Sequence, residues 1–353
     1  MSRNMVNACE YVFDIIKLKF DLYNWSRLPR DFDTLRMING TSYESRWLKQ
    51  SVIKLCNVIE ISDEVRFGVI SFDSKDYFFS TGLEEPEDLL PGFVPLQINS
   101  GLFTAIVSDL ELPVKKGISI LQLEEHVLAQ HVNVPLYVGH DFRDIALYFP
   151  HLCVFEITVE FPGLSINVYQ ITSAYLSKNA KFVTLPFSDD TLNHIYDLVM
   201  LNSKILSYES IVQTLVSSQF KFAFLDLYRC IEQLYQVIYV DEVHTNLGLN
   251  NMRADLLSSL DSDLKWKPQE SGSLQKIFSE TPENNKKELL NVIRSMIDEG
   301  RDYSAWLYKL RCSIVHLKSL HNNIHVTPNQ WNKIICGLAD VASYWYYKYQ
   351  DFY

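Results

Sequence analysis

The spacing of apolar residues changes part-way along the chain, and this change limits the fold more than any other feature of the sequence. In the N-terminal half, short runs rich in β-branched and aromatic residues alternate with turn residues, which is typical of strands. Pro162 and Gly163 lie between two such runs and predict a hairpin. The runs predicted as strands are residues 65–72, 118–123, 134–138, 154–161 and 166–172. Helical spacings at residues 6–22 and a second short element at residues 45–58 complete an expected α+β region.

A different spacing begins at Ser188 and continues to the C-terminus. Ser188 precedes Asp189 and Asp190, which is the pattern of an N-cap followed by an acidic first turn. The polar, proline-containing residues 264–285 predict a loop or insertion within this helical region. We therefore predict an α+β chain: an N-terminal domain of mixed helices and strands at residues 1–190, then an all-helical domain at residues 191–353.

The charge of the chain is distributed unevenly. At 353 residues the chain has room for about two domains, and a hydrophobic content of 47% is enough to bury full cores. A net charge of −11 argues against a general binder of nucleic acid. However, residues 1–200 carry 16 Lys and Arg against 26 Asp and Glu, a net charge of −10. Residues 301–353 carry 6 against 3, a net charge of +3, so a local RNA site near the C-terminus is compatible with the charge.

Cysteine usage and hydropathy indicate the cellular compartment and the cofactors that can be expected for this chain. The six cysteines are scattered and form no Cys-x-x-Cys pair, which predicts reduced thiols in the cytoplasm rather than disulfides or zinc. The chain has no apolar run of 18 residues, and charges interrupt any signal-peptide core, so no membrane association is expected. It also lacks a Gly-rich phosphate loop and a His-Glu-x-x-His motif. Neither a metal nor another cofactor is therefore expected. A metal-dependent enzyme is a third alternative to the two functions described below, and the sequence contains no ligand cluster for it.

Arg311 and His316 are the strongest candidates for chemistry. They lie in a stretch predicted to be helical over residues 303–318. An arginine holds phosphate with a fork of donors, and a histidine transfers protons near neutral pH. On an ideal helix, one apolar stripe is formed by Leu307, Leu310, Ile314 and Leu317. His316 falls about 140° and Arg311 about 80° from the middle of this stripe, so neither is expected in the core. Because the two lie about 140° apart, only a distorted helix or a second copy of the chain would bring them together.

This region resembles the HEPN superfamily, a group of small all-helical domains that includes many RNA-cleaving toxins and defence effectors. The motif of that family is Arg, four to six residues, then His, and Arg311 and His316 have the shortest of these spacings. Residues 222–235 resemble an early long helix of such domains, and residues 329–350 resemble a final helix. The resemblance covers residues 205–353.

The resemblance implies a metal-independent endoribonuclease that needs no cofactor. The RNA 2′-hydroxyl would attack the adjacent phosphate, His316 would act as general base or acid, and Arg311 would stabilise the developing charge. Family members usually pair two domains across a dimer, which implies a homodimer through the C-terminal domain. The resemblance also implies a toxin or antiviral, anti-phage effector, with an N-terminal domain that binds a trigger ligand or a partner protein.

Four further residues are candidates for RNA binding or for support of the site: Lys309, Lys318, Arg229 and Glu232. Lys309 projects close to His316 on the predicted helix. Lys318 would meet RNA phosphate or remain a solvated surface lysine. Arg229 and Glu232 are three positions apart, so they would either support the site from a neighbouring helix or form an ordinary intrahelical ion pair.

The main alternative is a catalytically inactive HEPN-like module that dimerises and acts as a scaffold in a defence or regulatory complex. Cys312 stands where many active members carry a polar residue, often Asn, and the acidic overall charge also favours this alternative. The position of His316 outside the apolar stripe and the basic C-terminal stretch favour the ribonuclease. The aromatic residues 344–349 would stack bases or, as we favour, pack a terminal helix against a core or a dimer interface.

Overall fold

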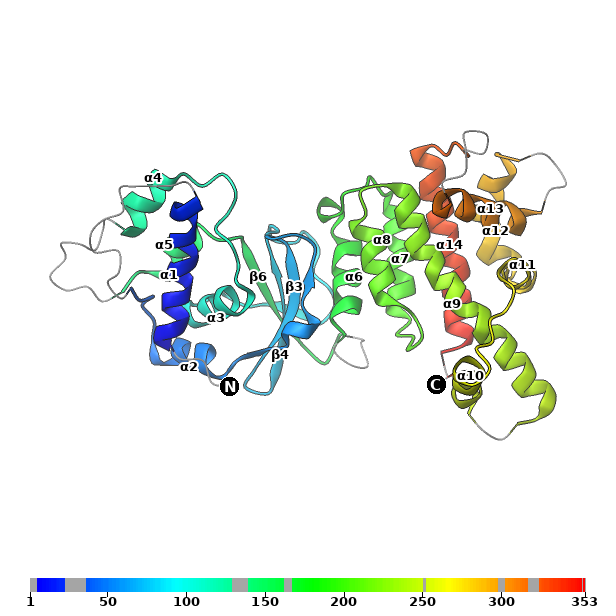
Figure 1. The fold of residues 1–353 in the computed structure, drawn as a ribbon, viewed down its shortest axis with the longest axis horizontal. Coiled ribbons are helices and arrows are strands. Elements are labelled where there is room, and N and C mark those ends of the chain that lie inside the picture. The colour runs from blue at the N-terminus through cyan, green and yellow to red at the C-terminus, as the bar shows by residue number, and fades with distance from the viewer. Residues whose placement is uncertain are drawn as a thin grey trace. The chain divides into compact units, whose positions relative to one another are not determined.

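The computed structural model describes residues 5–22, 36–128, 139–161, 167–249, 252–297, 302–316, 324–350 and 352. The chain forms two compact units, Met1–Phe161 and Pro162–Tyr353. The first unit holds an antiparallel sheet with helices, and the described residues of the second unit contain helices and no strand (Figure 1). This confirms the α+β class. The division between the units falls before residue 190, because helix α6 (Val168–Lys178) packs on helices of the second unit.

The first unit is built on a single antiparallel sheet. Its strands are β1 (Val52–Ile53), β2 (Ile59–Glu60), β3 (Arg66–Phe72), β4 (Lys75–Thr81), β5 (Phe93–Pro95) and β6 (Leu152–Ile157). Its helices are α1 (Met5–Leu22), α2 (Ser42–Gln50), α3 (Ser100–Leu110), α4 (Ile120–Leu123) and α5 (Phe142–Ala146), with short turns η1 (Leu55–Asn57) and η2 (Glu124–Leu128). The strand order is β1-β3-β4-β6-β5. Strands β1 and β2 both pair with β3.

A two-residue turn joins the central strands β3 and β4. Phe72 pairs with Lys75, and the intervening Asp73 and Ser74 have φ values of 53° and 62°. Two successive positive φ values are the geometry of the tight hairpin turn whose twist matches that of the strands, and Asp tolerates it well. The prediction of a strand at residues 65–72 is confirmed by β3.

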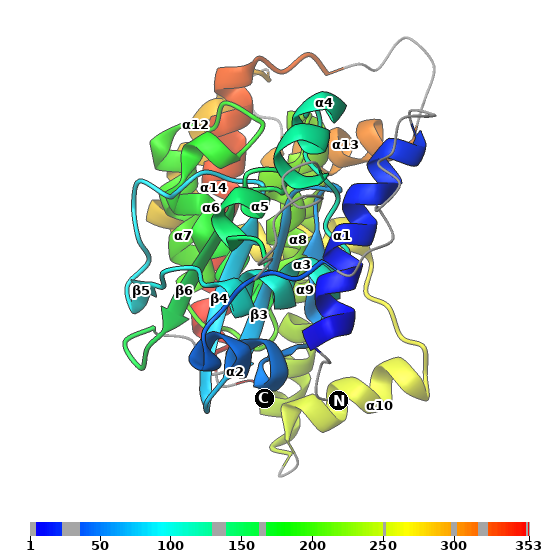
Figure 2. The same cartoon turned by 90° about the vertical axis from the view of Figure 1, so that its left-hand side faces the viewer.

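Helices α1, α2 and α3 cover one face of this sheet (Figures 1 and 2). Trp47 of α2 stacks on Phe72 of β3, with ring centroids 3.9 Å apart. Helix α3 crosses α2 at Gly101, where an added Cβ would lie 1.7 Å from the carbonyl oxygen of Glu44. Only glycine permits so close an approach, and the resulting core of the first unit lies between these helices and the sheet.

The second unit is a bundle of helices. These are α6, α7 (Asp189–Met200), α8 (Tyr208–Val216), α9 (Phe220–Leu247), α10 (Arg253–Ser262), α11 (Glu270–Glu280), α12 (Glu283–Arg294), α13 (Tyr303–Val315) and α14 (Pro328–Lys348), with a short turn η4 (Ala180–Phe182). As predicted, Ser188 caps α7, since its side chain accepts a hydrogen bond from Thr191 N at 3.3 Å. The long helices α9 and α14 pack on each other, and α14 also contacts α7 and α12.

The aromatic residues near the end of α14 pack into the core of the second unit. Trp345 and Tyr346 are fully buried. The indole of Trp345 donates to Thr281 Oγ1 at 2.9 Å, and the Tyr346 hydroxyl donates to the Cys230 carbonyl at 2.8 Å. Tyr347 is 62% exposed. Buried Trp345 and Tyr346 therefore satisfy their polar atoms within the bundle and are not available to stack bases.

Three predicted segments are wrong, and the hairpin predicted around Pro162 and Gly163 is wrong with them, because its second strand is part of α6. Residues 118–123 and 166–172 were expected to be strands, but Ile120–Leu123 forms α4 and Val168–Thr172 belongs to α6. Residues 264–285 were expected to be a loop, but they contain α11 and the start of α12. Pro282 is the N-cap residue of α12. Proline is tolerated where a helix begins, because the first N–H groups of a helix have no acceptor within the helix. The candidate strand at residues 134–138 lies outside the described residues.

Candidate functional site around Arg311 and His316

Helix α13 carries Arg311 and is followed directly by His316, and its first turn is capped by a side chain. The carboxylate of Asp302 caps its first turn by accepting from Ser304 N at 2.8 Å and Ala305 N at 3.4 Å. Leu307 and Leu310 are buried, which confirms this part of the predicted apolar stripe. The helix ends at Val315, earlier than the predicted residue 318, and His316 is its C-cap residue.

Arg311 is held in place by a carboxylate from another helix. Its Nε and one terminal nitrogen donate to Glu232 Oε1 at 3.1 and 2.9 Å, and its other terminal nitrogen lies 3.7 Å from Glu270 Oε2. Glu232 belongs to α9 and Glu270 to α11, so three helices meet at this guanidinium. The Arg311 side chain is 18% exposed, as expected for a residue at the margin of the apolar stripe.

The charges of this pair are partly desolvated. Burial raises the pKa of Glu232, and the nearby charge of Arg311 offsets this rise only in part. Burial opposes the charge on Arg311, but the nearby carboxylates of Glu232 and Glu270 favour it, and the arginine pKa is raised. Arg311 therefore stays charged, and Glu232 is a carboxylate whose ionisation costs more than it does in water.

His316 lies beyond the last turn of α13. Its backbone is extended, with φ −103° and ψ 109°, and its N–H donates to the Cys312 carbonyl at 2.9 Å. The residue is exposed. Because His316 is not helical, the angle of about 140° expected on an ideal helix does not describe its direction. In the described part of the chain, the guanidinium of Arg311 is bonded to Glu232 rather than to this imidazole.

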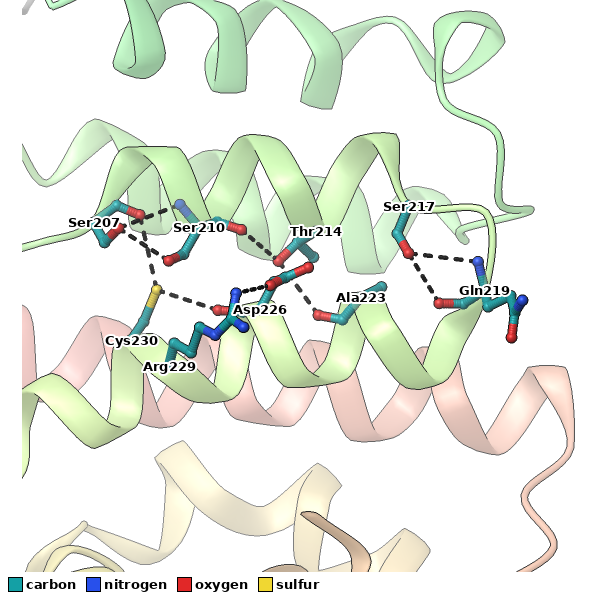
Figure 3. A network of polar contacts seen from close by, with 9 residues as sticks. All are labelled: Ser207, Ser210, Thr214, Ser217, Gln219, Ala223, Asp226, Arg229 and Cys230. Atoms are coloured by element: carbon teal, nitrogen blue, oxygen red, sulfur yellow. Dashed lines mark hydrogen bonds and ion pairs between the residues drawn. The ribbon is translucent and has the colours of Figure 1, made fainter. Parts of the chain in front are cut away.

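The predicted supporting residues do not all gather at the site. Glu232 does, but it binds Arg311 and not Arg229. Arg229 instead pairs with Asp226 on the same helix, among the contacts between α8 and α9 (Figure 3). Burial raises the pKa of Asp226, and Arg229 partly offsets that rise. The side chain of Arg229 is 62% exposed, so it lies at the surface of the bundle without joining the Arg311 cluster.

The two candidate lysines contribute no described contact with the cluster. Lys309 is an exposed residue of α13. Lys318 lies outside the described residues. Sequence reasoning missed Glu270, because α11 was expected to be a loop. The sequence signal that could have found it is the proline at 268, which precedes a helix rather than interrupting one.

Cys312 has a neighbour on its own helix. The neighbouring Cys312 thiol is the largest cause of a raised pKa of the Tyr308 phenol, which lies one turn earlier on α13. Cys312 is half-buried. The position that follows the arginine therefore carries a half-buried thiol beside a phenol of the same helix.

No family model, no curated protein and no solved structure matches this chain. In the described ranges, no helix has the length and apolar character required to cross a membrane. The residues of the site are therefore the basis for inferring a function. They comprise a charged guanidinium positioned by two carboxylates and an exposed imidazole at the end of the same helix.

Proposed function

We propose that the second unit is a metal-independent endoribonuclease of the HEPN type, and that the chain acts as a toxin or anti-phage defence effector. The observation that supports this most directly is the placement of Arg311 and His316 outside the core at one end of α13. The guanidinium is pre-positioned by Glu232, which lowers the entropy cost of presenting a rigid fork to a phosphate.

In the proposed reaction, His316 removes the proton from an RNA 2′-hydroxyl, and the resulting oxygen attacks the adjacent phosphorus. The bond to the 5′-oxygen breaks, a proton is returned to that oxygen, and the products carry 2′,3′-cyclic phosphate and 5′-hydroxyl ends. Arg311 stabilises the extra negative charge on the phosphate during this step, which is usually the largest contribution of such a site. A second copy of the chain would bring two motifs to one RNA, and we propose a homodimer through the helical unit.

The first unit would then act as the regulatory part, binding a trigger ligand or a partner protein. The acidic residues concentrated in the N-terminal part of the chain would keep RNA from binding there, because phosphate is repelled by a field of the same sign. Access of RNA would therefore be confined to the less acidic helical unit.

The test compares induced wild type with His316→Ala at matched soluble expression and dimerisation. The matched control is His325→Ala, because His325 is also exposed and lies outside the motif. We expect wild type and the control to arrest growth and leave 5′-hydroxyl RNA ends, and His316→Ala to lose about 10²-fold or more of the cleavage rate. Equal cleavage by His316→Ala would remove this residue from the mechanism.

The second candidate function is a catalytically inactive scaffold in a defence or regulatory complex. The observation that favours it is the pair of carboxylates at Arg311, since Glu232 and Glu270 both compete with a phosphate for the guanidinium. If wild type leaves RNA intact even under phage challenge and with neighbouring gene products present, the scaffold is the better proposal. In that case dimerisation should survive the change His316→Ala.

A further inference from the structure

A group of three metal-ligating side chains lies between α7 and α14, away from the Arg311 cluster. His194 of α7 and Cys336 and Asp340 of α14 each offer one ligand atom, and within the described ranges these atoms lie within 4.8 Å of one another. Cys336 is buried, while the side chains of His194 and Asp340 are 39% and 24% exposed. The group therefore has a buried sulfur at its base and an opening towards solvent.

The fold builds this group through a regular polar stripe. Asn332, Cys336 and Asp340 are each four positions apart, so they form one stripe along α14 that faces α7. At one end of the stripe, Asn332 Oδ1 accepts from Ser188 N at 2.8 Å and from Thr191 Oγ1 at 3.0 Å. These bonds fix the start of α7 against α14 and thereby set the position of His194.

The surroundings of the group are negative. Burial raises the pKa of the Cys336 thiol to about 12, and the carboxylates of Asp340, Asp190 and Glu288 add to this rise. Burial likewise raises the pKa of Asp340, with the hydrogen-bonded imidazole of His194 partly offsetting it. A bound divalent cation would reverse this balance, because it is attracted by the same carboxylates that oppose a thiolate.

We propose that His194, Cys336 and Asp340 bind a zinc ion, with water at the fourth position. A nitrogen, a sulfur and an oxygen ligand suit zinc, whereas magnesium and calcium take oxygen ligands alone. Bond lengths of about 2.0–2.3 Å in a tetrahedron put ligand atoms roughly 3.3–3.6 Å apart, so side-chain rotation within the observed group completes the site. On binding, the Cys336 thiol releases its proton to solvent, and the hydrogen bond between His194 and Asp340 is replaced by two bonds to the metal.

The proposed ion would tie α7 to α14. Helix α14 also packs on α9 and α12, so the ion would stabilise the bundle near its centre. None of the three ligands belongs to the proposed ribonuclease site, and the two proposals fail independently. The alternative without metal is a plain ion pair between His194 and Asp340 beside an inert thiol.

Cobalt(II), added alone to the chelator-treated full chain, is the direct probe, because a cobalt–thiolate bond gives charge-transfer absorption. We expect one cobalt per wild-type chain with this absorption. Cys336→Ser should lose the absorption, and Asp340→Asn and His194→Gln should bind more than about tenfold more weakly. The matched control is Cys56→Ser, because Cys56 is an exposed thiol of the first unit and its loss should change nothing.

Thermal unfolding with and without added zinc covers the case in which a variant folds poorly. Zinc should raise the Tm of wild type and of Cys56→Ser, and it should leave the Tm of folded Asp340→Asn unchanged. Absence of charge-transfer absorption from the wild type, or its persistence in Cys336→Ser, would overturn the proposal in favour of the plain ion pair.

Discussion

The ion pair between Arg311 and Glu232 makes a quantitative prediction about the stability of the helical unit. Two hydrogen bonds join the guanidinium to one carboxylate oxygen, and the two side chains are only 18% and 29% exposed. Because burial raises the pKa of Glu232 in spite of the arginine, the ionised carboxylate is only partly compensated. Removing the cation should therefore cost more than removing the anion.

We expect Arg311→Met, which keeps the apolar stem, to lower the free energy of unfolding by about 2–3 kcal/mol, since it leaves a desolvated carboxylate without its cation. Glu232→Gln should cost within about 1 kcal/mol, because glutamine still accepts a hydrogen bond and needs no ionisation. In the double variant the two losses should not add, and the coupling should be about 1–2 kcal/mol. Glu270 adds little, since its side chain is 48% exposed.

The assay is urea unfolding followed by tryptophan fluorescence. Trp266, Trp306, Trp331 and Trp345 belong to the helical unit, so four of the six tryptophans report on its unfolding. The same measurement tests the direction of the pH effect. A carboxyl whose folded pKa is raised contributes stability that is complete below its unfolded pKa of about 4.3 and is lost as pH rises through the folded pKa. The decrease in the free energy of unfolding caused by Glu232→Gln should therefore be largest in acid and should become smaller towards pH 7.

Two results would refute this reasoning. A coupling energy indistinguishable from zero would mean that the pair is not formed in solution. A larger loss of unfolding free energy for Glu232→Gln than for Arg311→Met would mean that the attraction between the two charges exceeds the cost of desolvating the Glu232 carboxylate. Either result would also weaken the view that Glu232 positions the guanidinium for a phosphate.

Further outcomes follow from close packing and polar contacts in the second unit. Gly337→Ala should destabilise by about 1–2 kcal/mol, because a Cβ would lie 2.8 Å from the backbone nitrogen of Leu289, and the helix-propensity gain of about 1 kcal/mol offsets only part of the clash. The control Gly272→Ala should raise the free energy of unfolding by up to about 1 kcal/mol, because the nearest atom to its added Cβ is Gln269 Oε1 at 3.8 Å. Equal changes in the Tm of the two variants would contradict the close crossing of α12 and α14. Asn332→Leu should cost about 2–4 kcal/mol in chemical denaturation by leaving buried partners unpaired, and a neutral result would contradict the bonds that fix α7.

The sequence predicted those helices and strands correctly whose signals involve only residues close together in the chain. Ser188 caps α7, residues 66–72 form β3, and α13 begins after Asp302. Capping, alternation and helical spacing involve neighbours within a few residues, so they can be read without the fold. The same reasoning was wrong for the strand predicted at residues 166–172, because the β-branched residues of Val168–Thr172 lie in a helix whose packing on α7 and α8 overrides their propensity.

The identity of Arg311 and His316 as site candidates came from the sequence, and so did the expectation that neither lies in the core. Only the tertiary structure decided what each one contacts. Glu232 is 79 positions from Arg311, and Asp340 is 146 positions from His194. Partners so distant are selected by the packing of whole helices, because burial of apolar faces fixes which polar margins meet. The sequence by itself therefore determined the helices and the candidate residues for chemistry. The carboxylates that contact Arg311 and the group of His194, Cys336 and Asp340 come together only because the bundle assembles.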